Sequence, residues 1–178
     1  MGRTDTKESN RIKSPVQRYV KFSGELGAFS YWDADAKKSV ALEQLDFIVL
    51  ETRASIGGWS DDQNAAIFSK YFKSTKNIVN IRCGDKDLMA GSFAENKDKI
   101  KALGGKYQQN VFALADINGT WELVAIQFTG AALMAWSTFV DETKMFNVYK
   151  SLVVGTQGAQ SKKGRVLFYA PAFSTEAC

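Results

Sequence analysis

Short runs of aromatic and β-branched residues, separated by turn-forming residues, recur along most of the chain and favour a fold built from β-strands. Residues 47–53 give the strongest signal, because four apolar residues come first, as in a strand buried on both faces. Residues 78–83 alternate apolar and polar side chains, which is typical of a strand with one buried face. Asn118 and Gly119 lie between two further strand-like runs and predict a tight hairpin turn.

Two segments have the apolar spacing of helices. Ser92 and Glu95 form a capping box at the start of the first segment, and two glycines at 104–105 end it. The second segment covers about residues 131–143, and its apolar face predicts that Trp136 lies in the core. With seven or eight short strands and one or two helices, the chain is expected to be mainly β, as a barrel or a sandwich.

The 178 residues are expected to form a single domain over residues 16–173, between a flexible basic arm at 1–15 and a short tail at 174–178. Residues 1–21 hold six basic and two acidic side chains, whereas the remainder holds 17 of each sign. No acidic residue falls between Glu142 and Glu176, although five basic ones do. Basic segments on a neutral body suit a polyanionic partner, and they suit a solubilising tail and a solvated loop equally well.

Several classes of function are disfavoured by what the sequence lacks. It has no histidine, and the two cysteines, Cys83 and Cys178, lie far apart. The usual general base, the nucleophile pairs that need histidine and a structural zinc site are therefore not expected, and the cysteine usage fits a reducing cytoplasm. Phosphate-loop and dinucleotide motifs are missing, and so are an apolar run of membrane length and a secretory signal. We expect no enzymatic activity, no cofactor and no membrane association.

Two pairs of aspartates allow an alternative. Asp33 with Asp35, and Asp85 with Asp87, would serve a metal-dependent nuclease if their carboxylates converged on Mg²⁺. Both pairs fall in predicted turns, where aspartate commonly accepts hydrogen bonds from the local backbone. A turn role is favoured, and no metal ligand is assigned.

Aromatic and basic residues are interleaved at several points, as a protein that binds single-stranded nucleic acid requires. Bases stack on rings, and the backbone follows cations. Each ring taken alone fits the core as well, but Trp32 and Trp59 border predicted loops and are expected to be exposed. The candidate stacking residues are Tyr31, Trp32, Trp59, Tyr71 and Tyr107. The candidate phosphate contacts are Arg53, Lys70, Lys73, Lys106 and, in a predicted loop at 155–164 and just after it, Lys162, Lys163 and Arg165.

A set of segments in a fixed order resembles a group of tailed-bacteriophage single-stranded DNA-binding proteins. The segments are 27–33, 47–51, 56–60, 100–107, 129–136 and 169–173, and the resemblance extends over about residues 20–173. It implies an OB-fold core, sequence-independent coating of single-stranded DNA, and a role in phage DNA replication or recombination in the host cytoplasm. Self-association along the strand and contacts with replication or recombination proteins are further expected partners. Many such binders recruit partners through an acidic tail, whereas this chain ends Ser-Thr-Glu-Ala-Cys, so recruitment by that route is not expected.

Two other functions remain open at this point. A virion or assembly protein would use the same β domain to pack subunits, and it would self-associate without DNA. The nuclease would consume its substrate only with Mg²⁺. A DNA-binding protein would instead lose affinity steeply as salt rises, because phosphate contacts release counterions.

Overall fold

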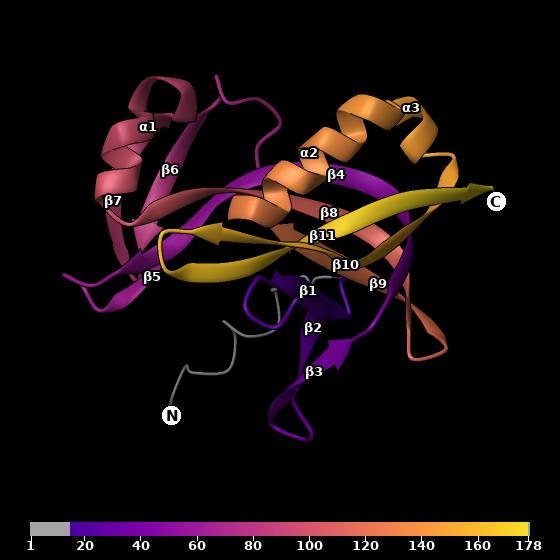
Figure 1. Ribbon diagram of the computed structural model, residues 1–178. Coiled ribbons are helices and arrows are strands. Elements are labelled where there is room, and N and C mark those ends of the chain that lie inside the picture. Colours follow the sequence, from indigo (N-terminus) through magenta and orange to yellow (C-terminus); the bar gives the residue numbers. More distant parts are fainter. Residues whose placement is uncertain (1–14, 178) are drawn as a thin grey trace, which may run out of the picture.

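The computed structural model describes residues 15–177, so that the basic arm expected at 1–15 lies, apart from Pro15, outside the described residues. Eleven strands and three helices make up this described part (Figure 1). The strands are β1 (Arg18–Ser23), β2 (Ala28–Asp33), β3 (Lys38–Leu42), β4 (Leu45–Ser60), β5 (Ala65–Ser69), β6 (Ile78–Cys83), β7 (Lys86–Ser92), β8 (Gly105–Ile117), β9 (Thr120–Phe128), β10 (Ser151–Lys163) and β11 (Val166–Ala177). The helices are α1 (Phe93–Ala102), α2 (Gly130–Thr143) and α3 (Met145–Val148).

The strands form one open sheet, in the order β3-β2-β1-β9-β8-β4-β5-β6-β7. All neighbours in this order are antiparallel except β1 and β9, which are parallel. The mainly β class is confirmed. The sheet is open and does not form the barrel that was one of the two expected architectures, because β3 and β7 end the order without pairing with each other.

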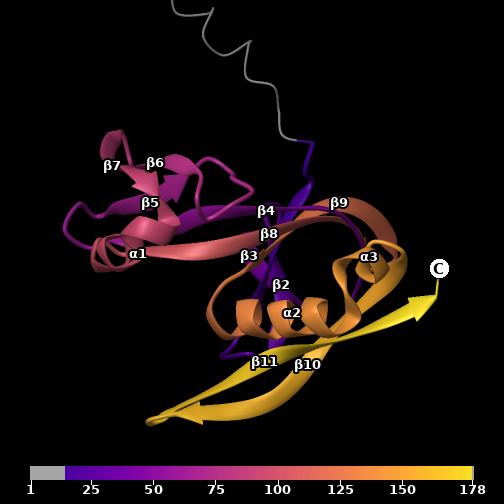
Figure 2. The same ribbon diagram turned by 90° about the horizontal axis from the view of Figure 1, so that it is seen from above.

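The long strand β4 explains why the sheet stays open. Its first residues pair with β10 on one edge, and its last residues pair with β5 on that same edge. The pairing with β8 on the other edge is interrupted by a bulge between Val49 and Glu51, and bulges bend a strand. The sheet therefore divides along β4, and the β10–β11 hairpin folds away from the β5–β7 strands (Figure 2).

The helices α1 and α2 lie on the same side of the long strands β4 and β8 (Figure 2). Two clusters of apolar side chains are buried on that side of the sheet. In the first, Trp136 of α2 is 1% exposed and stacks on Phe128, with ring centroids 5.2 Å apart. In the second, Ile100 of α1 packs among residues of β4, β5 and β6 that include Ile56 and Ile67. The core position predicted for Trp136 is confirmed.

The local signals for turns and helix ends are confirmed where short-range chemistry decides them. The Ser92 Oγ accepts a hydrogen bond from the backbone N–H of Glu95 at 3.4 Å and caps α1. Asn118 and Gly119 take φ values of 52° and 89°, as the two central residues of a type I′ hairpin turn do.

Replacing Ser92 by alanine is expected to lower the free energy of unfolding by about 1 kcal/mol, because the first turn of α1 loses its side-chain acceptor. Urea unfolding followed by circular dichroism measures the change. The matched control is Ser161→Ala on exposed β10, for which a change within about 0.5 kcal/mol is expected. Equal midpoints for the two variants would contradict a capping role.

Two segments expected to be loops are strands instead. β4 continues through Gly57 and Gly58 to Ser60, and β10 continues to Lys163, so the predicted 155–164 loop shrinks to a turn at Gly164. At Gly58 an added Cβ would lie 2.1 Å from the carbonyl oxygen of Gly104, so this glycine permits a close backbone approach within a strand. β11 likewise includes the described residues of the tail expected from 174.

None of the helices within residues 15–177 has both the length and the apolar character needed to cross a membrane.

Candidate functional site

The sheet face opposite the helices carries a large set of exposed side chains, and we call it the open face. In β9, Val124, Ile126 and Phe128 point into the core, so Leu123, Ala125 and Gln127 point the other way. The same alternation, followed along the paired strands, defines the rest of the face. Its exposed or half-buried members are Tyr19, Lys21, Trp32, Arg53, Trp59, Phe68, Phe112, Leu114 and Trp121, together with Tyr71 after β5.

Three rings form a row across this face from β2 to β8, and a fourth extends it. Tyr19 of β1 pairs with Ala125 of β9, which pairs with Phe112 of β8. Trp32 lies one residue beyond the Val20–Tyr31 pair of β1 and β2, and so stands beside Tyr19. Adjacent strands lie roughly 4.8 Å apart, so the row extends about 14 Å from β2 to β8.

Tyr71 extends the row beyond β8. Its ring meets the ring of Phe112 edge-on, with centroids 5.4 Å apart and an angle of 89° between the planes. Burial, and secondly the neighbouring Tyr19, raise the pKa of Tyr71 above its ordinary value. A raised pKa favours the uncharged phenol, which does not repel an anion. Tyr71 is still 49% exposed, so much of its ring is open to a partner.

A polar row with a cation near each end runs beside the rings. Lys21 pairs with Gln127, Gln127 pairs with Asn110, and Asn110 pairs with Arg53. Asn110 is fully buried and donates from Nδ2 to the Ser55 Oγ at 2.9 Å, while its Oδ1 has no hydrogen-bond partner among the described residues. The Arg53 guanidinium is paired with the Glu51 carboxylate. Lys21 makes no ion pair with any residue from 15 to 177.

On the other side of the rings the face is apolar. Leu123, Leu114 and Ile48 pair in register across β9, β8 and β4. Trp121 stands at the end of β9, opposite Asp116, and is 50% exposed. Exposed apolar surface of this extent, bordered by polar groups, commonly marks an interaction site.

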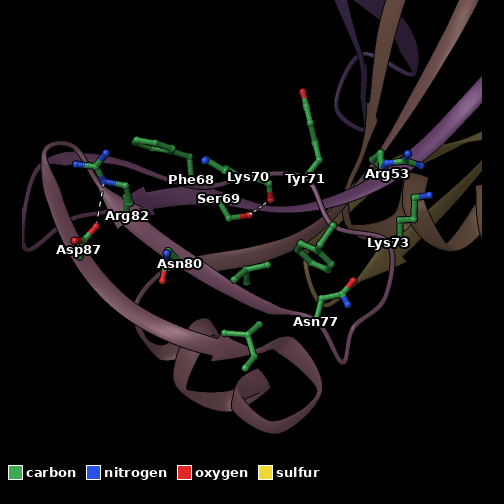
Figure 3. Close-up of a pocket in the computed structure, with 13 residues that line it drawn as sticks. Arg53, Phe68, Ser69, Lys70, Tyr71, Lys73, Asn77, Asn80, Arg82 and Asp87 are labelled. Carbon is green, nitrogen blue, oxygen red and sulfur yellow. Dashed lines mark hydrogen bonds and ion pairs between the residues drawn. The ribbon is translucent and has the colours of Figure 1, made fainter.

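Beyond β4 the open face continues into a groove of about 990 Å³ over β5 and β6 (Figure 3). Tyr71 projects from the chain after β5, and Arg53 and Lys73 lie close together at one end of the groove (Figure 3). Lys70 and Lys73 form no ion pair within the described part of the chain, whereas Arg82 is held by Asp87 at 3.2 Å. The groove thus joins exposed rings to free cations.

Six of the residues predicted from the sequence meet on the open face and in its groove: Trp32, Arg53, Trp59, Lys70, Tyr71 and Lys73. Trp32 and Trp59 are 63% and 53% exposed, as their positions beside loops predicted. The sequence interpretation missed Tyr19, Phe112 and Trp121. The signal for Tyr19 was its alternation with Val20.

Tyr31 was a candidate for stacking, and its position corrects that expectation. Its side chain is 7% exposed, the Arg18 guanidinium covers the ring at 4.5 Å, and its hydroxyl accepts a hydrogen bond from the Asn118 Nδ2 at 3.1 Å. Tyr31 and Trp32 are consecutive in a strand, so they point to opposite faces and only Trp32 reaches the open one.

The remaining candidates lie elsewhere. Lys106, Tyr107 and Lys163 line a hollow between α1, β8 and the β10–β11 hairpin, away from the ring row. Lys162 and Arg165 are exposed on either side of the hairpin turn. The twelve predicted residues therefore divide among the open face with its groove, the hollow, the hairpin turn and the core.

The aspartate pairs have local roles. The Asp33 Oδ1 accepts hydrogen bonds from the backbone N–H groups of Asp35 at 3.0 Å and Ala36 at 3.1 Å. Asp87 is held by Arg82, and the Asp85 carbonyl oxygen accepts a bond from the same guanidinium at 3.1 Å. Within residues 15–177, no three side chains of the metal-binding types Asp, Glu, Cys or His gather in one place.

No protein-family model, curated protein or solved structure matches this chain.

Proposed function

We propose that the protein binds single-stranded DNA through the open face, without preference for sequence. The observation that supports this most is the row of Trp32, Tyr19, Phe112 and Tyr71, which leaves rings exposed side by side along a surface bordered by cations. Successive unpaired bases stack on such rings, each worth roughly 1–3 kcal/mol.

The cations lie where they would meet the backbone of a strand stacked on these rings. Lys21 and Arg53 stand in the neighbouring row, and Lys70 and Lys73 flank Tyr71 in the groove. Arg53 would exchange its Glu51 partner for a phosphate, to which its planar fork is well matched. Every base has a flat face, so stacking supplies affinity without sequence preference.

The ring row also favours single strands over duplex. Bases inside a duplex are stacked on each other and present only their edges, so exposed rings gain little from them. An unpaired strand can lay its bases flat on Trp32 and Tyr71.

The wider role follows from the resemblance of the segment order to phage single-stranded DNA-binding proteins. We propose that the protein acts in phage DNA replication or recombination in the host cytoplasm, and that its domain is a variant of the OB-fold type opened along β4. Contacts with replication or recombination proteins belong to the same proposal.

One feature favours a second candidate function, subunit packing in a virion or an assembly. Within residues 15–177, β11 pairs with no strand other than β10, so most of its outer edge lacks a partner strand, although the Tyr169 N–H donates to the Gly24 carbonyl oxygen at 2.7 Å. Free edges pair readily with strands of other chains. Gel filtration distinguishes the two functions, since an assembly protein would self-associate without DNA and a coating protein mainly on the strand.

Titration with oligo-dT is expected to quench tryptophan fluorescence, because Trp32, Trp59 and Trp121 are all at least half exposed on the open face. If Lys21, Arg53, Lys70 and Lys73 each meet one phosphate, the logarithm of the binding constant should fall with the logarithm of salt concentration with a slope of about −3. The measurement uses at least two salt concentrations with duplex DNA as competitor. No quenching, or competition by duplex as strong as by oligo-dT, would refute the proposal.

A further inference from the structure

A second concentration of positive charge lies on the side of the sheet that carries the helices. A hollow of about 710 Å³ opens between α1, the start of β8, the end of β10 and the N-terminus of α2. Four lysines line it: Lys97, Lys101, Lys106 and Lys163. The first three come from α1 and the start of β8, which are consecutive in the chain, whereas Lys163 comes from the distant strand β10 and is brought to them by the fold.

These lysines have no acidic partners. None of the four forms an ion pair with any residue that the structure describes. The acids of α1, Glu95 and Asp98, do not line the hollow. Like charges brought together without counter-charges repel each other, and that cost falls when an anion binds between them.

The N-terminus of α2 adds to the positive field. Thr129 and Gly130 line the hollow, and this 14-residue helix has neither a side-chain cap nor an acidic residue in its first turn. Its first N–H groups therefore keep free hydrogen-bonding capacity, and the positive end of the helix dipole is uncompensated. Lysines and a helix N-terminus together match the charge and the hydrogen-bonding needs of a phosphate group.

Part of the lining is aromatic. The rings of Phe93 and Tyr107 lie 5.0 Å apart, both half-buried, beside the lysines. An isolated inorganic ion gains nothing from rings, whereas a nucleotide presents a phosphate together with a base whose flat face can stack on a ring. The chemistry of the hollow therefore fits a phosphate carried by a nucleotide unit.

We propose that this hollow is a second nucleic-acid contact, which binds backbone phosphates of a DNA strand on the helical side of the sheet. The identity of the strand rests on the proposed function, whereas the phosphate chemistry rests on the hollow alone. Because the hollow and the open face lie on opposite sides of the sheet, a strand longer than the open face reaches the hollow only by passing an edge of the sheet. The hollow then extends the site for long strands and leaves short ones unaffected.

The double variant Lys97→Ala/Lys101→Ala tests this against the matched control Lys99→Ala/Lys76→Ala, whose lysines do not line the hollow. Anisotropy is measured with labelled oligo-dT of about 6 and about 30 nucleotides, since single domains of this kind cover roughly 4–16. We expect the test variant to bind the long strand about tenfold more weakly than wild type does. The slope of the logarithm of its binding constant against the logarithm of salt concentration should be smaller in magnitude by about 1.4. Its affinity for the short strand should equal that of wild type. The control variant should match wild type on both strands.

Equal affinity of the two variants for the long strand would overturn the inference while leaving the open-face proposal standing. If the wild-type protein binds neither the short nor the long strand, both the open-face proposal and this inference are refuted. A third measurement adds dTTP and follows thermal unfolding. If dTTP stabilises wild type but not the test variant, and the test variant binds the long strand as wild type does, the hollow is a site for free nucleotides. The assignment of the hollow to a DNA strand is then wrong.

Discussion

Replacing Trp32 and Tyr71 together by alanine is expected to weaken binding of oligo-dT at least about 30-fold. The two residues stand toward opposite ends of the ring row, and each offers a base an exposed ring. With roughly 1–3 kcal/mol for each stacked base, losing two rings costs about 2–6 kcal/mol. Each 1.4 kcal/mol is about a tenfold change in affinity, so the lower bound is already easily measured.

The matched control for this variant is Phe146→Ala. Phe146 is 67% exposed, similar to Trp32, but it belongs to α3, away from the open face, with the Lys150 ammonium over its ring. Anisotropy of a labelled strand should show wild-type affinity for the control and weak affinity for the double variant. Wild-type affinity in the double variant, with an unchanged circular dichroism spectrum, would remove the ring row from the site.

Replacing Trp136 by alanine is expected to lower the free energy of unfolding by about 3–5 kcal/mol. Its ring is 1% exposed and packs against Phe47, Phe128 and Phe173, so the substitution leaves a large cavity where α2 meets the sheet. Urea unfolding at equilibrium measures the loss. Met134→Ala is the control on the same helix: Met134 is 73% exposed, and a change within about 0.5 kcal/mol is expected. An unchanged midpoint for the Trp136 variant would contradict its role in the core.

The elements that could be predicted from the sequence are those set by neighbours along the chain. Ser92 caps α1 by bonding a backbone group three residues away, and Gly119 permits a turn that L-residues with larger side chains disfavour. The apolar face of α2 is likewise a property of one segment. In each case the contact that decides the local structure is made by residues a few positions apart, so the structure can be predicted from the local sequence.

The course of the open sheet depends on contacts between distant segments. Gly58 looks like a loop residue until the approach of the Gly104 carbonyl is known. The start of β10 and the start of β11 could be predicted as a strand pair, but the continuation of β10 from Gly155 to Lys163 could not, because this part is rich in glycine, glutamine and lysine and is held by pairing rather than by propensity. The split of β4 between β10 and β5 leaves no mark in the local pattern.

The candidate site likewise combines features that the local sequence predicts with features that depend on contacts between distant segments. Tyr31 and Trp32 alternate, so one of them had to face the core, but only the register with β1 decides which. Phe112 becomes part of the site because it meets Tyr71, more than forty positions earlier in the chain. Lys97, Lys101 and Lys163 gave no common signal, since a helix and a hairpin must come together before their charges add.

The long strands β4 and β8 run beneath both helices, and β4 supplies residues to both apolar clusters. Neither cluster can be lost without freeing a strand on which the other depends. The halves of the molecule around Trp136 and Ile100 therefore share one cooperative unfolding transition, and damage to either half weakens the surface that both support.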